Sequence, residues 1–397
     1  MIRKRETAGP SDLPRRIYAF VDSVVEADPE RPRSRMSLQF DAVDANAFDE
    51  TSGSVENRDA LLLARVSTTP NRLGQLFGVD RAKEGDWFEI KLDRARSRPR
   101  AWQLPLVNNY TPERPINVVG ITPLAQFSEI VGHLEGACVA PDARRVETAD
   151  SLAALLSTDA KNNLRVTALD VGQAACVVFS EGSQPLGYFD VGAPMFFNRR
   201  SFPKQLNHRP ASEGFVILSH WDFDHFSLAL RYPELKKLQW FAPDQPVGPN
   251  TALFQKSLGS NLTFISNDFD VGALALRRCS GTSVRDRNST GYALRVNLEG
   301  TGILLPGDAD YQWVPRTIAN SVNRIMVPHH GARGSPPPSP SGGNNPVAIV
   351  SYGTPNTYRH PNEDQIDAHR RAGWRIRRTA AHGNPTRPRG NRTLYPI

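Results

Sequence analysis

Residues 216–225 read VILSHWDFDH, an apolar run that ends abruptly in two histidines and two aspartates. The run predicts a buried strand, and the polar residues after it predict a loop at the strand end. His220, Asp222 and Asp224 alternate, so an extended loop would point their side chains in one direction, and His225 follows directly. Imidazole nitrogens beside carboxylate oxygens are the donors that a divalent metal needs. The alternative is a polar surface loop with solvated histidines.

Three later apolar runs also end in histidine or aspartate. They are ILLPGD at 303–308, RIMVPHHG at 324–331, and VAIVSYG at 347–353, whose loop continues to His360. The additional candidate side chains are therefore Asp308, His329, His330 and His360. When four strands each deliver such residues at the C-terminal end, one rim of a sheet is expected to carry a site.

The order of these motifs resembles that of the metallo-β-lactamase superfamily. The motifs are DVGQ at 170–173, DVG at 190–192, SHWDFDH at 219–225, GD at 307–308 and PHHG at 328–331. Within the superfamily the chain is most similar to the hydrolase domain of ComEC-like DNA-uptake competence proteins. The likeness covers residues 163–397 and implies an α/β fold, namely a four-layer αββα sandwich.

The resemblance also implies a centre of two divalent metal ions that share a hydroxide. Its implied ligands, with the two members of the histidine pair as alternatives, are His220, Asp222, Asp224, His225, Asp308, His329 and His330. Asp308 would bridge the ions, His220 and Asp222 would bind the first, and the remaining residues would bind the second. The implied ions are zinc or manganese, with magnesium possible.

The implied catalytic residues are Asp224, His330 and His360. The histidine of the 329–330 pair that is not a ligand could bind a phosphoryl oxygen. His360 could protonate a leaving group or bind phosphate, although it could equally be a loop histidine without a role. Asp170 and Asp190 are expected to be turn residues that bond nearby backbone N–H groups and support the site loops.

Two departures from the superfamily pattern concern the first metal. The usual His-x-His is replaced by His220-Trp221-Asp222, and no histidine lies between His225 and His329. The first metal therefore loses imidazoles and gains a carboxylate. Because oxygen-rich ligand sets suit harder ions, we expect manganese to support at least as much activity as zinc.

The length of 397 residues suits one large domain and a smaller one. Residues 1–140 are predicted to form an N-terminal domain of unknown role, with a strand in the alternating segment 85–92. Residues 141–162 are predicted to be a linker with a short helix at 151–156, and residues 163–397 the hydrolase domain. The N-terminal domain could recruit a protein partner.

Composition constrains the partners and the compartment. The formal net charge of +7 permits binding to nucleic acid, and arginines are concentrated after residue 358. No apolar run is long enough for a membrane span, so no membrane insertion is expected. The three cysteines are scattered, which is typical of a reducing compartment, and the expected location is cytoplasmic.

Three functions remain open from the sequence. The first is a metal-dependent phosphodiesterase, most specifically a nuclease, which the resemblance and the basic segment favour. The second is a hydrolase of small esters, lactones or phosphorylated metabolites, since one fold can host many activities. The third is an interaction protein that kept the fold without catalysis, and the retention of every ligand of the second metal argues against it.

Overall fold

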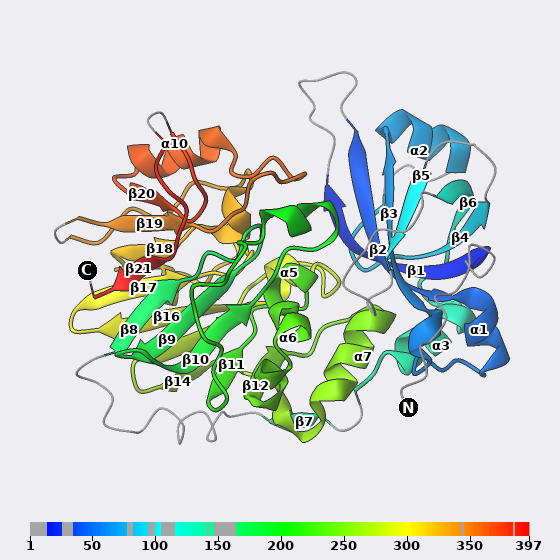
Figure 1. Ribbon diagram of the computed structural model, residues 1–397, viewed down its shortest axis with the longest axis horizontal. Coiled ribbons are helices and arrows are strands. Elements are labelled where there is room, and N and C mark those ends of the chain that lie inside the picture. Colours follow the sequence, from blue (N-terminus) through cyan, green and yellow to red (C-terminus); the bar gives the residue numbers. More distant parts are fainter. Residues whose placement is uncertain are drawn as a thin grey trace. The chain divides into compact units, whose positions relative to one another are not determined.

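The computed structural model describes residues 14–25, 35–77, 82–93, 100–104, 116–140, 143–146, 164–342, 345–383 and 386–396. The chain divides into two compact units. The first comprises residues 1–139 together with residues 247–253, and the second comprises residues 140–246 and 254–397. Figure 1 shows the elements of both units.

A closed barrel of six strands forms the first unit. Its strands, in the order in which they pair around the barrel, are β1 (Arg16–Val25), β2 (Met36–Asp44), β3 (Leu61–Thr68), β5 (Arg100–Leu104), β6 (Ile116–Pro123) and β4 (Trp87–Asp93). Apolar side chains such as Ile17, Phe40 and Ile90 fill the interior. Helices α1 (Ala45–Glu50), α2 (Pro70–Phe77) and α3 (Glu129–Ala137) complete the unit. A closed barrel leaves no unpaired sheet edge, which explains how a small unit stays ordered.

A buried carboxylate ties residues 247–253 into this first unit. Asp41, on β2, is fully buried and accepts hydrogen bonds from the backbone N–H groups of Asn250 (2.7 Å) and Thr251 (3.0 Å). The side chains of Asn250 and Thr251 donate to the same carboxylate. A Cβ atom on Gly248 would lie 2.5 Å from Asp41, so the segment needs glycine there.

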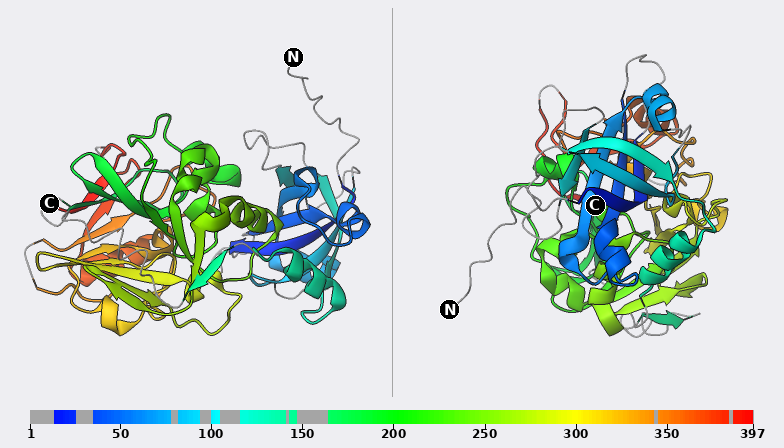
Figure 2. Two further views of the ribbon diagram at one scale, coloured as in Figure 1. Left: turned by 90° about the horizontal axis from the view of Figure 1, so that it is seen from below. Right: turned by 90° about the vertical axis from the view of Figure 1, so that its right-hand side faces the viewer.

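Two sheets packed face to face form the second unit (Figure 1 and Figure 2). The eight-stranded sheet runs in the order β21 (Arg392–Tyr395), β8 (Leu164–Ala168), β9 (Cys176–Glu181), β10 (Gln184–Val191), β11 (Phe215–Ile217), β12 (Gln239–Pro243), β13 (Leu262–Ile265) and β7 (Arg144–Val146). The seven-stranded sheet runs in the order β14 (Phe269–Val271), β15 (Leu274–Arg278), β16 (Tyr292–Leu298), β17 (Thr301–Leu305), β18 (Arg324–Met326), β19 (Val347–Val350) and β20 (Arg375–Arg378).

The inner faces of the two sheets enclose the main hydrophobic core, which contains Phe215, Ile217, Leu305 and Ile349. Helix α10 (Glu363–Arg371) covers the outer face of the seven-stranded sheet, where Ile366 packs against a second apolar cluster. On the other sheet, α5 (Phe223–Phe226) and α7 (Pro249–Leu258) bring Phe226 and Phe254 into contact with Trp240 and its neighbours. The predicted α/β sandwich with an added β-containing unit is therefore confirmed.

Several local predictions can be compared with the described residues. Strands occur where the apolar runs at 216–218, 303–305, 324–327 and 347–350 predicted them. Part of the predicted linker, Arg144–Val146, is strand β7 and pairs with β13. The helix predicted at 151–156 lies outside the described residues. Within the described part of the chain, no helix is long and apolar enough to cross a membrane.

Candidate metal centre

The C-terminal ends of four strands supply the site. β11 leads to His220 and His225, β17 to Asp308, β18 to His329 and His330, and β19 to the loop that carries His360. Strands β17, β18 and β19 are parallel neighbours, so their polar ends meet at one edge of the seven-stranded sheet. β11 belongs to the eight-stranded sheet, so the site joins the rims of two sheets, whereas the sequence predicted a single rim.

The loop after β11 is extended only as far as Asp222. Helix α5 begins at Phe223, with Asp222 as its N-cap residue, so Asp224 and His225 lie on a helical turn. The expectation that His220, Asp222 and Asp224 point in one direction from an extended loop is therefore wrong. The helix turns Asp224 toward His330, 3.3 Å from its Nε2, while Asp222 stays 3.4 Å from the Nε2 of His220.

His225 is held between two carboxylates. Its Nδ1 lies 2.8 Å from Oδ2 of Asp190, and its Nε2 lies 3.1 Å from Oδ1 of Asp308. Asp190 also accepts hydrogen bonds from the backbone N–H (2.7 Å) and hydroxyl (2.9 Å) of Ser219. Because Asp190 can only accept, Nδ1 of the neutral imidazole carries the proton, and Nε2 presents a lone pair to Asp308.

The same reasoning orients His220. Ser219 donates its hydroxyl proton to Asp190, so its oxygen accepts from Nδ1 of His220 at 2.9 Å. The Nε2 lone pair of His220 consequently faces Oδ2 of Asp222. The rings of His220 and His225 lie 4.1 Å apart between centroids, which brings their nitrogens into one site.

The histidine pair divides into a buried and an exposed member. Nδ1 of His330 lies 2.9 Å from the carbonyl oxygen of Ser351, which can only accept, so its Nε2 lone pair faces Asp224. His330 is buried, whereas the side chain of His329 is 43% exposed and its Nε2 lies 3.8 Å from Asp308. Both residues have left-handed φ angles, 48° and 54°. This sharp local backbone points the two rings apart, and only His330 joins a compact group of donors.

The donor set fits divalent cations. Two groups have ligand atoms that all lie within 4.8 Å of one another, namely His220 with His225 and Asp308, and Asp224 with His225 and His330. The Nε2 atoms of all three histidines are buried and have no hydrogen-bond partner of acceptable geometry among the described residues. Lone pairs of nitrogen and oxygen thus face each other at 3.1–3.4 Å, an arrangement that a proton or a metal ion between them would stabilise.

The imidazoles and carboxylates of the site stabilise each other's charged forms. Burial opposes the charged form of His225, but Asp308 and Asp190 together hold the pKa of this imidazole well above its usual range. Burial likewise opposes ionisation of Asp308, yet His225, His329 and His330 hold its pKa well below the usual value. A site that attracts protons onto its imidazoles is one from which a metal ion would displace them.

Asp222 has a partner that the sequence did not suggest. Its Oδ1 lies 2.8 Å from Nη2 of Arg287, which is fully buried at the start of helix α8 (Arg287–Thr290). Burial alone would raise the pKa of Asp222, but Arg287, with help from His220, lowers it to about 2. A permanent cation therefore lies beside Asp222 at this edge.

His360 lies beside the histidine pair. Its ring centroid is 5.4 Å from that of His329 and 6.3 Å from that of His330. Burial, together with the neighbouring His329 and His330, holds its pKa well below the usual value. Asn356 fixes the backbone on both sides of the ring by donating to the carbonyl and accepting from the N–H of His360. The loop that the sequence extended from β19 thus places this imidazole at the site.

Asp190 supports the site loop, as predicted, but through partners that are distant in sequence. It was expected to bond nearby backbone N–H groups, but its partners Ser219 and His225 are 29 and 35 positions away. Asp170 does bond the N–H of Gly172, and it also forms two short contacts with Arg389. The two Asp-Val-Gly motifs look alike in sequence, so only their surroundings separate a residue that orients a ligand from one that anchors a distant loop.

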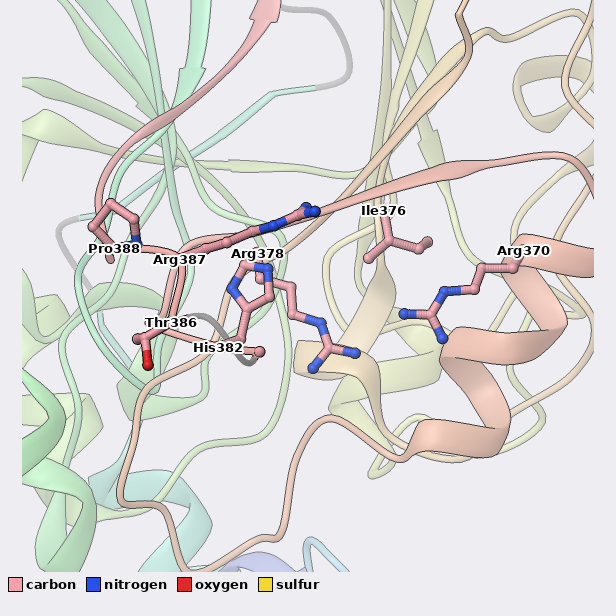
Figure 3. Close-up of a pocket in the computed structure, with 8 residues that line it drawn as sticks. Arg370, Ile376, Arg378, His382, Thr386, Arg387 and Pro388 are labelled. Atoms are coloured by element: carbon pink, nitrogen blue, oxygen red, sulfur yellow. The ribbon is translucent and has the colours of Figure 1, made fainter.

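The predicted basic segment does not act as one surface. Figure 3 shows Arg370 of α10, Arg378 of β20 and Arg387 of the following loop converging on a cavity of about 510 Å³. Arg378 is paired with Glu363 through two hydrogen bonds of 3.0 and 2.8 Å, and Arg370 is paired with Asp367. Two of the three positive charges at this cavity are therefore already countered.

No protein-family model matches the chain, and no curated protein matches it. Among solved structures it is similar to Tm1679, a metal-dependent hydrolase of the β-lactamase superfamily (14% identity, TM-score 0.35, covering 54% of this chain and 95% of that one). It is similar to zinc-bound PqqB from Methylobacterium extorquens (9% identity, TM-score 0.31, covering 52% of this chain and 85% of that one). It is also similar to the metallo-β-lactamase fold protein YhfI from Bacillus subtilis (14% identity, TM-score 0.28, covering 41% of this chain and 71% of that one). Such likenesses concern the fold, and the ComEC-like branch stays a prediction.

Proposed function

We propose that the protein is a metal-dependent hydrolase of the metallo-β-lactamase superfamily that cleaves phosphodiesters, and that nucleic acid is its substrate. The observation that carries the metal-dependent part is the convergence of three buried imidazole lone pairs on carboxylate oxygens. Each imidazole is oriented by a separate acceptor, namely Ser219, Asp190 or the carbonyl of Ser351. Outer partners of this kind fix the tautomer of a metal-binding histidine.

The geometry favours one division of the ligands. An imidazole nitrogen has a single lone pair, so His225 can bind only one ion although it belongs to both groups of donors. We assign His220, His225 and one oxygen of Asp308 to a first ion. We assign Asp224, His330 and the other oxygen of Asp308 to a second. This moves His225 from the second ion, where the sequence placed it, to the first, and it leaves Asp222 beside the first group of donors instead of within it.

Divalent ions held there would lower the pKa of a water molecule and stabilise negative charge on the attacked phosphorus. The protein's own contribution is to orient the ligands and to place the rings of His329 and His360 beside His330. There the two imidazoles are positioned to donate hydrogen bonds to phosphoryl oxygens. Arg287 keeps Asp222 ionised beside the first ion and adds a fixed positive charge.

Charge and cysteine chemistry support the choice of substrate and compartment. The net charge of +7 favours a polyanionic substrate, and the barrel unit offers a second surface that could bind a protein partner. Cys138, Cys176 and Cys279 are buried and unpaired, which fits a reducing compartment such as the cytoplasm.

The test is turnover by the purified full chain after metal removal and titration with Mn²⁺, Zn²⁺ or Mg²⁺. The substrates are single- and double-stranded DNA, RNA, a chromogenic phosphodiester and a lactone, with Asp308→Ala as the inactive control. Metal-dependent cleavage of a nucleic acid that Asp308→Ala lacks would support the proposal. Cleavage of the lactone alone would replace it with the small-ester function. Metal binding without turnover of any substrate would favour a catalytically inactive protein.

A further inference from the structure

Four arginines lie where the two sheets of the second unit meet at an open edge. Arg324 begins β18, Arg375 and Arg377 lie on β20, and Arg392 begins β21. β20 is the last strand of the seven-stranded sheet, and β21 is the first strand of the eight-stranded sheet. Arg392 connects the two edges, since its Nε donates to the carbonyl of Arg378 at 2.8 Å.

The strand register shows that these side chains face the space between the sheets. Arg324 and Arg375 both pair with Val347, and Arg377 pairs with Ile349. Val347 and Ile349 belong to the core between the sheets, and residues paired side by side point to the same face. Arg392 pairs in the same way with Ala168, another member of that core. Ile376, between the two arginines of β20, points outward and packs against the other apolar cluster.

The positive charge of this arginine cluster is not balanced. No carboxylate among the described residues forms an ion pair with any of the four, whereas Arg370, Arg378 and Arg389 each have one. Arg324 is only 7% exposed; its Nη1 donates to the carbonyl of Asn323, and its Nε has no hydrogen-bond partner in the described structure. Arg392 donates only to neutral carbonyls.

The four charges also repel one another. Burial, followed by the charges of Arg375 and Arg377, lowers the pKa of Arg324. Burial, followed by the charges of Arg375 and Arg392, lowers the pKa of Arg377. Like charges held close together in a partly buried place destabilise the free protein, so a binding partner of opposite charge is expected.

A structural explanation accounts for part of the cluster. Inward-pointing charges on an edge strand prevent two sheets from joining edge to edge, and Arg375 and Arg377 could serve that purpose on β20. β18, however, is an interior strand that pairs with β17 and β19. Arg324 therefore cannot protect an edge, and its buried, incompletely bonded guanidinium needs another reason.

We propose that Arg324, Arg375, Arg377 and Arg392 form a binding site for phosphate groups at the open edge of the sandwich. Guanidinium groups bind phosphate oxygens through paired hydrogen bonds, and several of them together suit a group with more than one negative charge. The phosphates could belong to a nucleic acid strand, which would extend the proposed function, or to a small polyphosphate, which would not depend on it.

The test measures binding to the full chain in EDTA, so that turnover at the metal centre does not contribute. The first arm follows the thermal shift caused by pyrophosphate, and the second follows the anisotropy of labelled single-stranded DNA at several salt concentrations. The main variant is Arg375→Gln with Arg377→Gln, because these side chains are exposed or half-buried and their loss should be tolerated. Arg165→Gln with Arg278→Gln removes the same charge elsewhere. Arg370→Gln with Arg387→Gln tests the cavity of Figure 3.

We expect the main variant to bind at least one ligand about tenfold more weakly and to lower the salt slope for DNA by about 1.4, which corresponds to two lost phosphate contacts. Its ligand-free form should melt at a higher temperature than the wild type at low salt, because repulsion is relieved. A loss confined to DNA identifies a nucleic acid strand, and a loss confined to pyrophosphate identifies a small polyphosphate. Unchanged binding of both ligands, or a loss caused only by the cavity pair or equally by the charge control, would overturn the proposal.

Discussion

Strand β18 begins with Arg324 and leads directly to His329 and His330, so the two ends of one strand lie in opposite electrostatic surroundings. At the metal-centre rim, carboxylates outnumber the one buried guanidinium, that of Arg287. At the open edge, the four guanidiniums of the arginine cluster form no ion pair with a carboxylate among the described residues. The rim also aims its donors, because each imidazole is oriented by a specific acceptor. The arginine cluster is arranged by strand register and by hydrogen bonds from Arg324 and Arg392 to backbone carbonyls, with no specific acceptor recorded for Arg375 or Arg377 among the described residues. We therefore expect the rim to select its cation by geometry and the edge to bind phosphate mainly by charge.

The largest effect is expected at Asp308, which faces both groups of donors. Asp308→Ala should abolish turnover. It should also lower metal affinity by more than about 10–100-fold, the loss expected when a residue that only orients a ligand is removed. Metal content by elemental analysis and titration calorimetry would measure this. Pyrophosphate binding at the arginine cluster should be unaffected. Wild-type turnover with a full complement of metal in Asp308→Ala would break the comparison, because the rim would not be the cation site.

The histidine pair provides a sharper test of geometry at the rim. His330→Ala should lose most of the second ion, since its Nε2 faces Asp224 at 3.3 Å. His329→Ala should keep metal affinity and lose turnover, because its side chain is exposed, belongs to neither group of donors and is expected to contact the substrate. Calorimetry and steady-state kinetics on the two variants separate these effects. The reverse pattern would show that the exposed histidine is the ligand.

A matched pair of aspartates tests the role of outer partners. Asp190→Asn should weaken metal binding by about 10–100-fold, because the amide cannot serve both Ser219 and Nδ1 of His225 as the carboxylate does. Asp170→Asn, in the other Asp-Val-Gly motif, should change metal affinity little and loosen the loop that Arg389 holds. Equal effects of the two substitutions on metal affinity would remove the distinction that the structure draws between them.

The smallest expected effect on turnover concerns metal preference. Asp222→His alone should destabilise the protein by about 3–5 kcal/mol, because Arg287 would remain buried without its counter-charge. Combining it with Arg287→Met should restore stability and shift relative affinity from manganese toward zinc by adding an imidazole. Urea unfolding and parallel titrations with the two metals measure both quantities. If the double variant is as unstable as the single one, the ion pair does not have the role assigned to it.

Much of this arrangement could be predicted from short-range patterns in the sequence. Apolar runs followed by histidine or aspartate identified the strands that converge on the rim, because parallel neighbours end at the same edge. Every candidate ligand from His220 to His330 lies at or beside the site. The incorrect predictions concern where the side chains point, and not where the residues lie. The helical turn at Phe223 and the left-handed backbone at His329 and His330 decide which donors meet, and neither has a reliable sequence signal.

Long-range partners could not be predicted for a different reason. Arg287 and Asp222 are separated by 65 positions, so no spacing rule connects them, and the outcome depends on how α8 packs against the loop after β11. The basic segment after residue 358 illustrates the same limit. Its arginines alternate between the two faces of β20, and the fold gives one face a counter-charge at Glu363 and leaves the other without one.

The buried contact of Asp41 with residues 247–253 has a consequence for how this protein can be divided. The first unit is discontinuous in sequence, because the chain leaves it after Val139, returns at Val247 and leaves again after Leu253. A fragment cut at residue 139 would lack Asn250 and Thr251, which together donate four hydrogen bonds to Asp41. The loss of these donors is expected to destabilise the barrel, because a hydrogen bond to a charged group contributes about 1.5–3 kcal/mol. The barrel unit is therefore built from two separate segments of the chain, and a truncation after residue 139 is expected to yield a less stable barrel than the full chain.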